Sequence, residues 1–230
     1  CLVLGNIFTN VYSGEIQGES LGIDVDVFND KGKKINIGKK GELVVKKPFP
    51  TMPIKFWNDI NFKKFKKAYF SKYKNIWHHG DFIQKTSRGG FIILGRSDAT
   101  LNPGGVRIGT AEIYRQVEKI EFVRESLVVG QSYNNDIRII LFIVLKGKNG
   151  LKEKDIKFVK SQIKKNCSPK HVPHKVIEIK EIPKTKSGKI VELAVKKAIH
   201  GEKIENLQSL SNPHSINFFK KIYKTDLLNE

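Results

Sequence analysis

Short apolar runs separated by turn-forming residues predict β-strands along much of the chain. The runs are rich in Val, Ile, Leu and Phe, of which Val, Ile and Phe are common in strands. Asn29-Asp30-Lys31-Gly32 and the segment 85–90 have the composition of turns between them. We predict strands at 23–28, 41–46, 91–94, 127–130 and 137–145.

Other segments carry apolar residues at helical spacing. From Phe62, four aromatic residues recur among lysines, and from Thr110, which suits an N-cap, Ile113 and Val117 share one face. We predict helices at these two places and over 152–165, 190–199 and 216–223, the fourth ended by Gly201.

These elements predict an α+β fold with a β-rich part over 1–97 and a mixed α/β part over 98–230. The segment 80–109 is dense in Gly, Asp, Arg, Asn and Pro. That composition is typical of a domain junction that carries function.

The net charge of +19 raises the question of nucleic-acid binding. The positive charge comes mainly from lysine. Proteins that recognise nucleic-acid bases usually use the bidentate guanidinium of arginine. The best support is the segment 63–74, where lysines alternate with aromatics, but helical spacing of those aromatics favours a core-facing stripe with solvated lysines. We predict no nucleic-acid partner, and keep a basic binding module as the alternative from another class.

Cys1 and Cys167 form neither a disulfide framework nor a metal-ligand pattern. Reduced thiols suit a cytoplasmic protein, and no apolar run is long enough to span a membrane. His78 and His79 are adjacent, so they point in different directions on a regular element, and we predict no metal site.

Three motifs carry candidate chemistry. Gly80-Asp81 follows an apolar stretch and presents a carboxylate at a strand end, where it suits ribose hydroxyls, although an ordinary turn aspartate is the alternative. The segment 95–109 holds several glycines between Arg96 and Arg107, whose guanidinium groups suit phosphate oxygens. The segment 183–189 (PKTKSGK) is a lysine-tipped loop able to neutralise a transferring phosphoryl group, and it lacks the first glycine of a Walker A loop.

Together, Gly-Asp, Gly-Arg-x-Asp, Gly-x-Arg-Ile and Pro-Lys-Thr-x-Ser-Gly-Lys, in this order, resemble the signature series of adenylate-forming enzymes. Within that superfamily, the chain most resembles the acetoacetyl-CoA synthetases, in 41–50, 56–59, 95–113, 168–173 and 184–195. The resemblance implies the end of a large N-terminal adenylation domain over 1–97. A small mobile C-terminal lid domain with a polar helical tail would follow over 98–230.

On this resemblance, acetoacetate would first be adenylated by ATP, with Mg²⁺ as the implied cofactor. Asp81 would hold the ribose hydroxyls, and Arg96 would support the nucleotide. Arg107 would reach a phosphate of ATP. Lys189 would be the catalytic residue, bridging the carboxylate and α-phosphate oxygens.

The resemblance also implies residues for the second half-reaction, in which coenzyme A takes the acyl group. Asp98 would be the hinge of the small domain. Gly104 and Gly105 would let the pantetheine arm pass, and Lys160 and Lys164 would contact the phosphates of CoA.

The phosphate loop, the adenine-binding motif and most of the acyl pocket of such enzymes lie upstream of the residues present here. We therefore expect the chain to be part of a longer polypeptide, whose N-terminal part is its missing partner, and to be inactive alone. An acetate or propionate ligase of the same superfamily and an inactive remnant stay open as alternatives.

Overall fold

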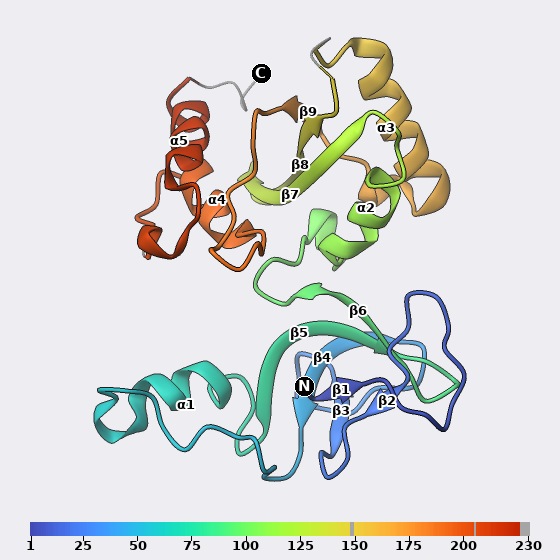
Figure 1. Ribbon diagram of the computed structural model, residues 1–230, viewed down its shortest axis with the longest axis vertical. Coiled ribbons are helices and arrows are strands. Elements are labelled where there is room, and N and C mark those ends of the chain that lie inside the picture. Colours follow the sequence, from blue (N-terminus) through green and yellow to red (C-terminus); the bar gives the residue numbers. More distant parts are fainter. Residues whose placement is uncertain (148–149, 205, 226–230) are drawn as a thin grey trace. The chain divides into compact units, whose positions relative to one another are not determined.

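The chain folds as two units, Cys1–Ser97 and Asp98–Glu230. The computed structural model describes residues 1–147, 150–204 and 206–225. Each unit has its own sheet and its own hydrophobic core, and Figure 1 shows the elements of each. Within the described part of the chain, every helix is too short or too polar to cross a membrane.

The first unit is built on a four-stranded antiparallel sheet in which each strand pairs with the next along the chain. The strands are β3 (Val25–Phe28), β4 (Lys40–Val45), β5 (Trp77–Lys85) and β6 (Phe91–Arg96), and β1 (Val3–Leu4) pairs separately with β2 (Gly18–Glu19). The strands predicted at 23–28, 41–46 and 91–94 are confirmed. β5 was not predicted, because His-His-Gly-Asp interrupts its apolar pattern.

The aromatic residues after Phe62 line the inner face of α1 (Lys63–Tyr69). Phe65 is buried and the ring of Tyr69 stacks on that of Trp77, with centroids 3.7 Å apart. The four lysines of α1 are exposed. This arrangement fits a core-facing stripe, except that Phe62 precedes the helix and is 43% exposed.

The second unit has a three-stranded sheet in the order β7-β8-β9. β7 (Val123–Tyr133) and β8 (Asp136–Leu145) form an antiparallel hairpin, and β9 (Lys175–Glu178) lies parallel to β8. A parallel neighbour requires a crossover connection, which α3 (Glu153–Asn166) supplies. The predicted strand at 137–145 is confirmed, the one at 127–130 is longer than predicted, and β9 was missed.

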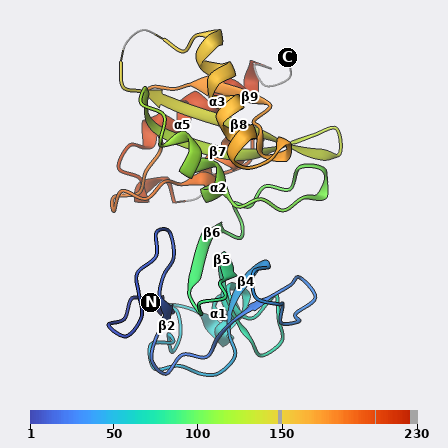
Figure 2. The ribbon, with the colours of Figure 1, turned by 90° about the vertical axis from the view of Figure 1, so that its right-hand side faces the viewer.

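Helices cover both faces of this sheet, which explains the unbroken apolar run of β8. Ile140 and Phe142 pack with α4 (Glu192–Ile199) and α5 (Ile216–Lys224), whereas Ile139 and Leu141 pack with α2 (Thr110–Val117) and α3. Figure 2 shows α3 in front of the sheet and α5 behind it. Alternate residues of one strand thus enter two separate cores.

The predicted starts of α2 and α4 were wrong by one or two residues. Gly109, not Thr110, is the N-cap of α2, and its N–H donates to the Glu112 side chain at 3.0 Å. α4 begins at Glu192, because Ile190 forms a bridge with Lys184. Single 3₁₀ turns lie at Ile60–Phe62, Pro103–Gly105, Pro169–His171, Leu207–Ser209 and Pro213–Ser215.

Candidate functional site

Asp81 and Arg96 face each other across β5 and β6. The two residues are directly paired in the sheet register, and the Arg96 Nη1 donates to the Asp81 Oδ1 at 3.0 Å. Asp81 lies inside β5, so its prediction as a strand-end or turn aspartate was wrong. The sheet therefore brings together a carboxylate and a guanidinium, two groups that suit ribose hydroxyls and phosphate oxygens.

Gly80 makes this close pairing possible. Its φ is +82°, a conformation that favours glycine, and an added Cβ would lie 2.7 Å from the Arg96 Nη2. Its carbonyl accepts the N–H of Ser97 at 2.9 Å. The glycine before the aspartate is thus required by the backbone and by the guanidinium that lies over it.

His79 borders the Asp81–Arg96 pair. Burial lowers the pKa of the His79 imidazole, and the charges of Arg96 and His78 lower it further, against the effect of Asp81. The Trp77 Nε1 donates a hydrogen bond to the His79 Nδ1 at 3.3 Å. His78 instead contacts Glu42, so the two adjacent histidines serve different partners. Among the described residues, no three His, Cys, Asp or Glu side chains are grouped to hold a metal ion.

Glu42 was missed by the sequence reasoning. It is fully buried, and its carboxylate accepts hydrogen bonds from Lys72 at 2.8 Å and from the Ser97 hydroxyl, and lies 3.0 Å from the His78 Nε2. A buried carboxylate needs such partners to remain charged. The only signal available was an acidic residue inside an otherwise apolar strand.

In the second unit, the loop of the second motif is closed by a short antiparallel bridge. Leu101 and Ile108 exchange backbone hydrogen bonds of 2.9 and 2.8 Å. Arg107 is next to this bridge, with its Nε 3.4 Å from the Thr100 Oγ1. Asp98 is exposed at the start of the unit.

The tip of this loop is held by Asp136. The Gly104 N–H donates to both carboxylate oxygens of Asp136, at 2.8 and 3.0 Å. This bond, with the N–H of Ile137 and the charge of Lys170, keeps the pKa of Asp136 below its usual value. A polar groove of about 540 Å³ lies beside Gly105, lined by Asn102 and residues 132–137. Asp136 was not singled out from the sequence.

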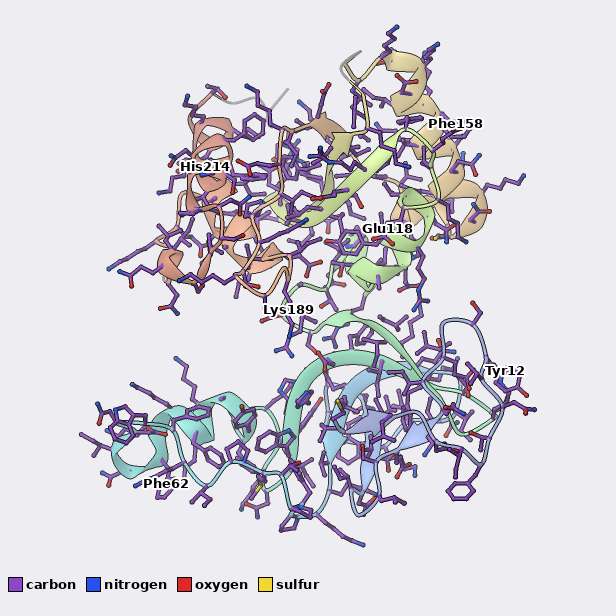
Figure 3. All side chains as sticks on the ribbon, in the orientation of Figure 1. Tyr12, Phe62, Glu118, Phe158, Lys189 and His214 are labelled. Carbon is purple, nitrogen blue, oxygen red and sulfur yellow. The ribbon has the colours of Figure 1, made fainter. Side chains whose placement is uncertain are left out.

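Lys189 lies on a tight loop before α4, where Figure 3 labels it. Thr185 N donates to the Lys189 carbonyl at 2.8 Å, and Lys189 N donates to the Thr185 Oγ1 at 3.1 Å. Gly188 has φ +82° in the turn. The loop also pairs with the tail, because Lys186 N donates to the Ser209 carbonyl at 3.0 Å. Lys189 is exposed, and its backbone is fixed by these bonds.

The two lysines predicted for CoA phosphates differ in their surroundings. Lys160 donates to the His174 carbonyl at 2.9 Å, so it already has a partner within the unit. Lys164 is exposed in the last turn of α3.

Residues 115–189 match the family described as AMP-binding enzyme C-terminal domain. Over 219 residues, the chain is 51% identical to the acetoacetyl-coenzyme A synthetase of Rhizobium meliloti (strain 1021), covering 95% of this chain and 34% of that protein. Over 225 residues, it is 44% identical to the acetoacetyl-CoA synthetase of Gallus gallus, covering 96% of this chain and 33% of that protein. The chain is homologous to the C-terminal portion of acetoacetyl-CoA synthetases.

A solved structure supports this relationship. The acetoacetyl-CoA synthetase from Streptomyces lividans is 39% identical, with a TM-score of 0.87 over 93% of this chain and 32% of that one. The chain spans about a third of the length of the acetoacetyl-CoA synthetases that it matches. The resemblance to adenylate-forming acyl-CoA synthetases and the α+β fold are thereby confirmed.

Proposed function

We propose that this chain supplies the C-terminal part of an acetoacetate–CoA ligase, with 1–97 ending the adenylation domain and 98–230 forming its lid. A carboxylate oxygen of acetoacetate attacks the α-phosphorus of ATP, and pyrophosphate leaves. The CoA sulfur then attacks the acyl carbon, AMP leaves, and the thiol proton is released. The observation that carries the proposal is similarity to acetoacetyl-CoA synthetases along 95% of the chain at up to 51% identity.

In the first step, the Asp81–Arg96 pair would bind the nucleotide. Lys189 would contact the reacting oxygens of the carboxylate and the α-phosphate. Two anions approach each other in this step, so a cation between them lowers the barrier. Lys189 suits this role because its side chain is exposed while its backbone is held by Thr185. Arg107 would reach an ATP phosphate. Mg²⁺, the implied cofactor, would enter bound mainly to the phosphates of ATP.

In the second step, the pantetheine arm of CoA would pass close to the backbone of the Gly104–Gly105 turn. The space where a Gly105 side chain would lie is open, and the polar groove lies beside it. Asp98 would be the hinge, and Lys164 is better placed than Lys160 to contact CoA phosphates, since Lys160 already bonds to His174.

ATP–pyrophosphate exchange by the full-length protein tests the proposal, with acetoacetate, acetate and propionate in parallel. We expect acetoacetate to give the fastest exchange. Lys189→Ala should lower the rate roughly 10²–10³-fold, since one stabilising group of the transition state is removed. Lys186→Ala, in the same loop and also exposed, is the matched control and should retain the parent rate.

Faster exchange with acetate or propionate would reassign the acyl substrate within the superfamily. A folded full-length protein without exchange for any acid would overturn the proposal in favour of an inactive remnant. The 230-residue chain alone should show no exchange.

A further inference from the structure

A hydrogen-bonded pair, Tyr114 of α2 and Glu192 of α4, joins the two helices that follow the motif loops of the second unit. The Tyr114 hydroxyl donates to the Glu192 Oε1 at 2.5 Å and accepts the Val128 N–H of β7 at 3.1 Å. The residues lie 78 positions apart in the chain. The phenol therefore bonds both to a helix that is remote in sequence and to β7, the next element along the chain.

The Glu192 carboxylate has a second donor, the Thr110 side chain at the start of α2. Burial raises the pKa of Glu192, the hydrogen bonds from Tyr114 and Thr110 oppose that rise, and the charge of Asp98 adds to it. Burial also raises the pKa of Tyr114 well above its usual value, so its hydroxyl keeps its proton. The two donors fix the position of the Glu192 carboxylate between α2 and α4.

Glu192 is the first residue of α4 and lies three positions after Lys189. Between them, Val191 N donates to the Pro183 carbonyl at 3.3 Å, which closes the base of the lysine loop. Fixing Glu192 on α2 thus fixes one end of that loop. Thr110, which also bonds to Glu192, follows the loop that carries Arg107. The Glu192 carboxylate therefore links the Arg107 loop to the Lys189 loop.

We propose that Tyr114 and Glu192 are positioning residues that hold the Lys189 loop at a set distance from the start of α2. Neither residue touches substrate in this role. Its catalytic consequence rests on the proposed function, because Lys189 serves the adenylation step there. A displacement of about 1 Å of a catalytic group can lower a rate by up to about 10²-fold.

Hydrogen–deuterium exchange on the 230-residue chain tests the geometric part without any assay of activity. Tyr114→Phe removes only the hydroxyl. We expect the backbone amides of Thr185, Gly188 and Lys189, which donate within the loop, to exchange roughly tenfold faster, the effect of one lost hydrogen bond. Amides of β8 should be unchanged.

Tyr73→Phe is the matched control. Tyr73 is buried in the first unit, and its hydroxyl donates to the Asn29 carbonyl at 2.9 Å. This variant loses an equivalent bond and should leave the exchange of the lysine loop unchanged. Unaltered loop exchange in Tyr114→Phe, or equal acceleration in β8, would overturn the proposal, since the pair would then be an ordinary stability contact.

The two half-reactions of the full-length protein test the catalytic part. Tyr114→Phe should lower ATP–pyrophosphate exchange about tenfold and leave thioester formation from supplied acyl-adenylate unchanged. Glu192→Gln keeps an acceptor oxygen and should retain more exchange activity than Glu192→Ala. An equal loss in both half-reactions would overturn the positioning role. A parent protein without exchange would instead refute the proposed function, and the deuterium result would still decide the geometry.

Discussion

Asp136 is a single residue whose carboxylate holds the tip of the Gly104 loop. Its two carboxylate oxygens accept the N–H of Gly104, the larger cause of its lowered pKa. Hydrogen bonds to a charged form favour that form. The loop tip at Gly104 is therefore held by a carboxylate that must remain ionised.

This pairing predicts an acid-induced release of the loop. Because the folded pKa of Asp136 lies below the unfolded value, its stabilisation is fully present above about pH 4 and is lost as the pH falls through the folded pKa. An NMR titration that follows the Gly104 amide should show a midpoint below the ordinary Asp range. Asp136→Asn should abolish this transition, and a midpoint at or above the ordinary value in the parent chain would contradict the assignment.

The residue types of the motifs were predictable, but their partners were not. Asp81, Arg96 and Lys189 stand out in the sequence because glycines and lysines surround them. The bond between Asp81 and Arg96 depends on the register of β5 and β6, and β5 was not predicted. Glu42 and Asp136 gave almost no sequence signal, since each acts through a contact that is distant along the chain.

At the scale of elements, α5 completes one of the two cores of the second unit. Phe219 is fully buried and packs edge-on against Phe142 of β8, with ring centroids 4.9 Å apart. The neighbouring Phe218 is 40% exposed. Apolar spacing over 216–223 was enough to predict this helix, although nothing in that pattern identified the strand it covers.

Truncation of Phe219 should therefore destabilise the second unit strongly. We expect Phe219→Ala to lower its free energy of unfolding by about 3–5 kcal/mol, from lost burial and the cavity left behind. Phe218→Ala, the matched control, should lower it by less than about 1 kcal/mol because Phe218 is already partly in solvent. Urea denaturation followed by circular dichroism measures both, and similar losses in the two variants would show that α5 is not packed as described.

At the scale of the whole molecule, each unit has a core of its own. Leu43, Ile83 and Phe91 belong to the core of the first unit, whereas the two cores of the second lie on either face of β8. A unit that buries its own core can unfold by itself. We therefore expect two unfolding transitions.

Tryptophan fluorescence can separate these transitions, because both tryptophans, Trp57 and Trp77, lie in the first unit and Trp77 is buried. Phe219→Ala should shift the circular-dichroism transition of the second unit to lower urea concentration. The fluorescence transition should keep its midpoint. A common shift of both signals would show that the units unfold as one.

Local patterns in the sequence were sufficient for most elements, for the α+β class and for the resemblance to adenylate-forming enzymes. Apolar periodicity shows which face of a segment packs against a core. A motif can be recognised from its own residues, without knowledge of its partners in the fold. The bonds of Tyr114 to Glu192, of Glu42 to Ser97 and of Gly104 to Asp136 required the folded chain. Each joins residues at least 32 positions apart, and such pairs meet only when strand register and helix packing fix their positions.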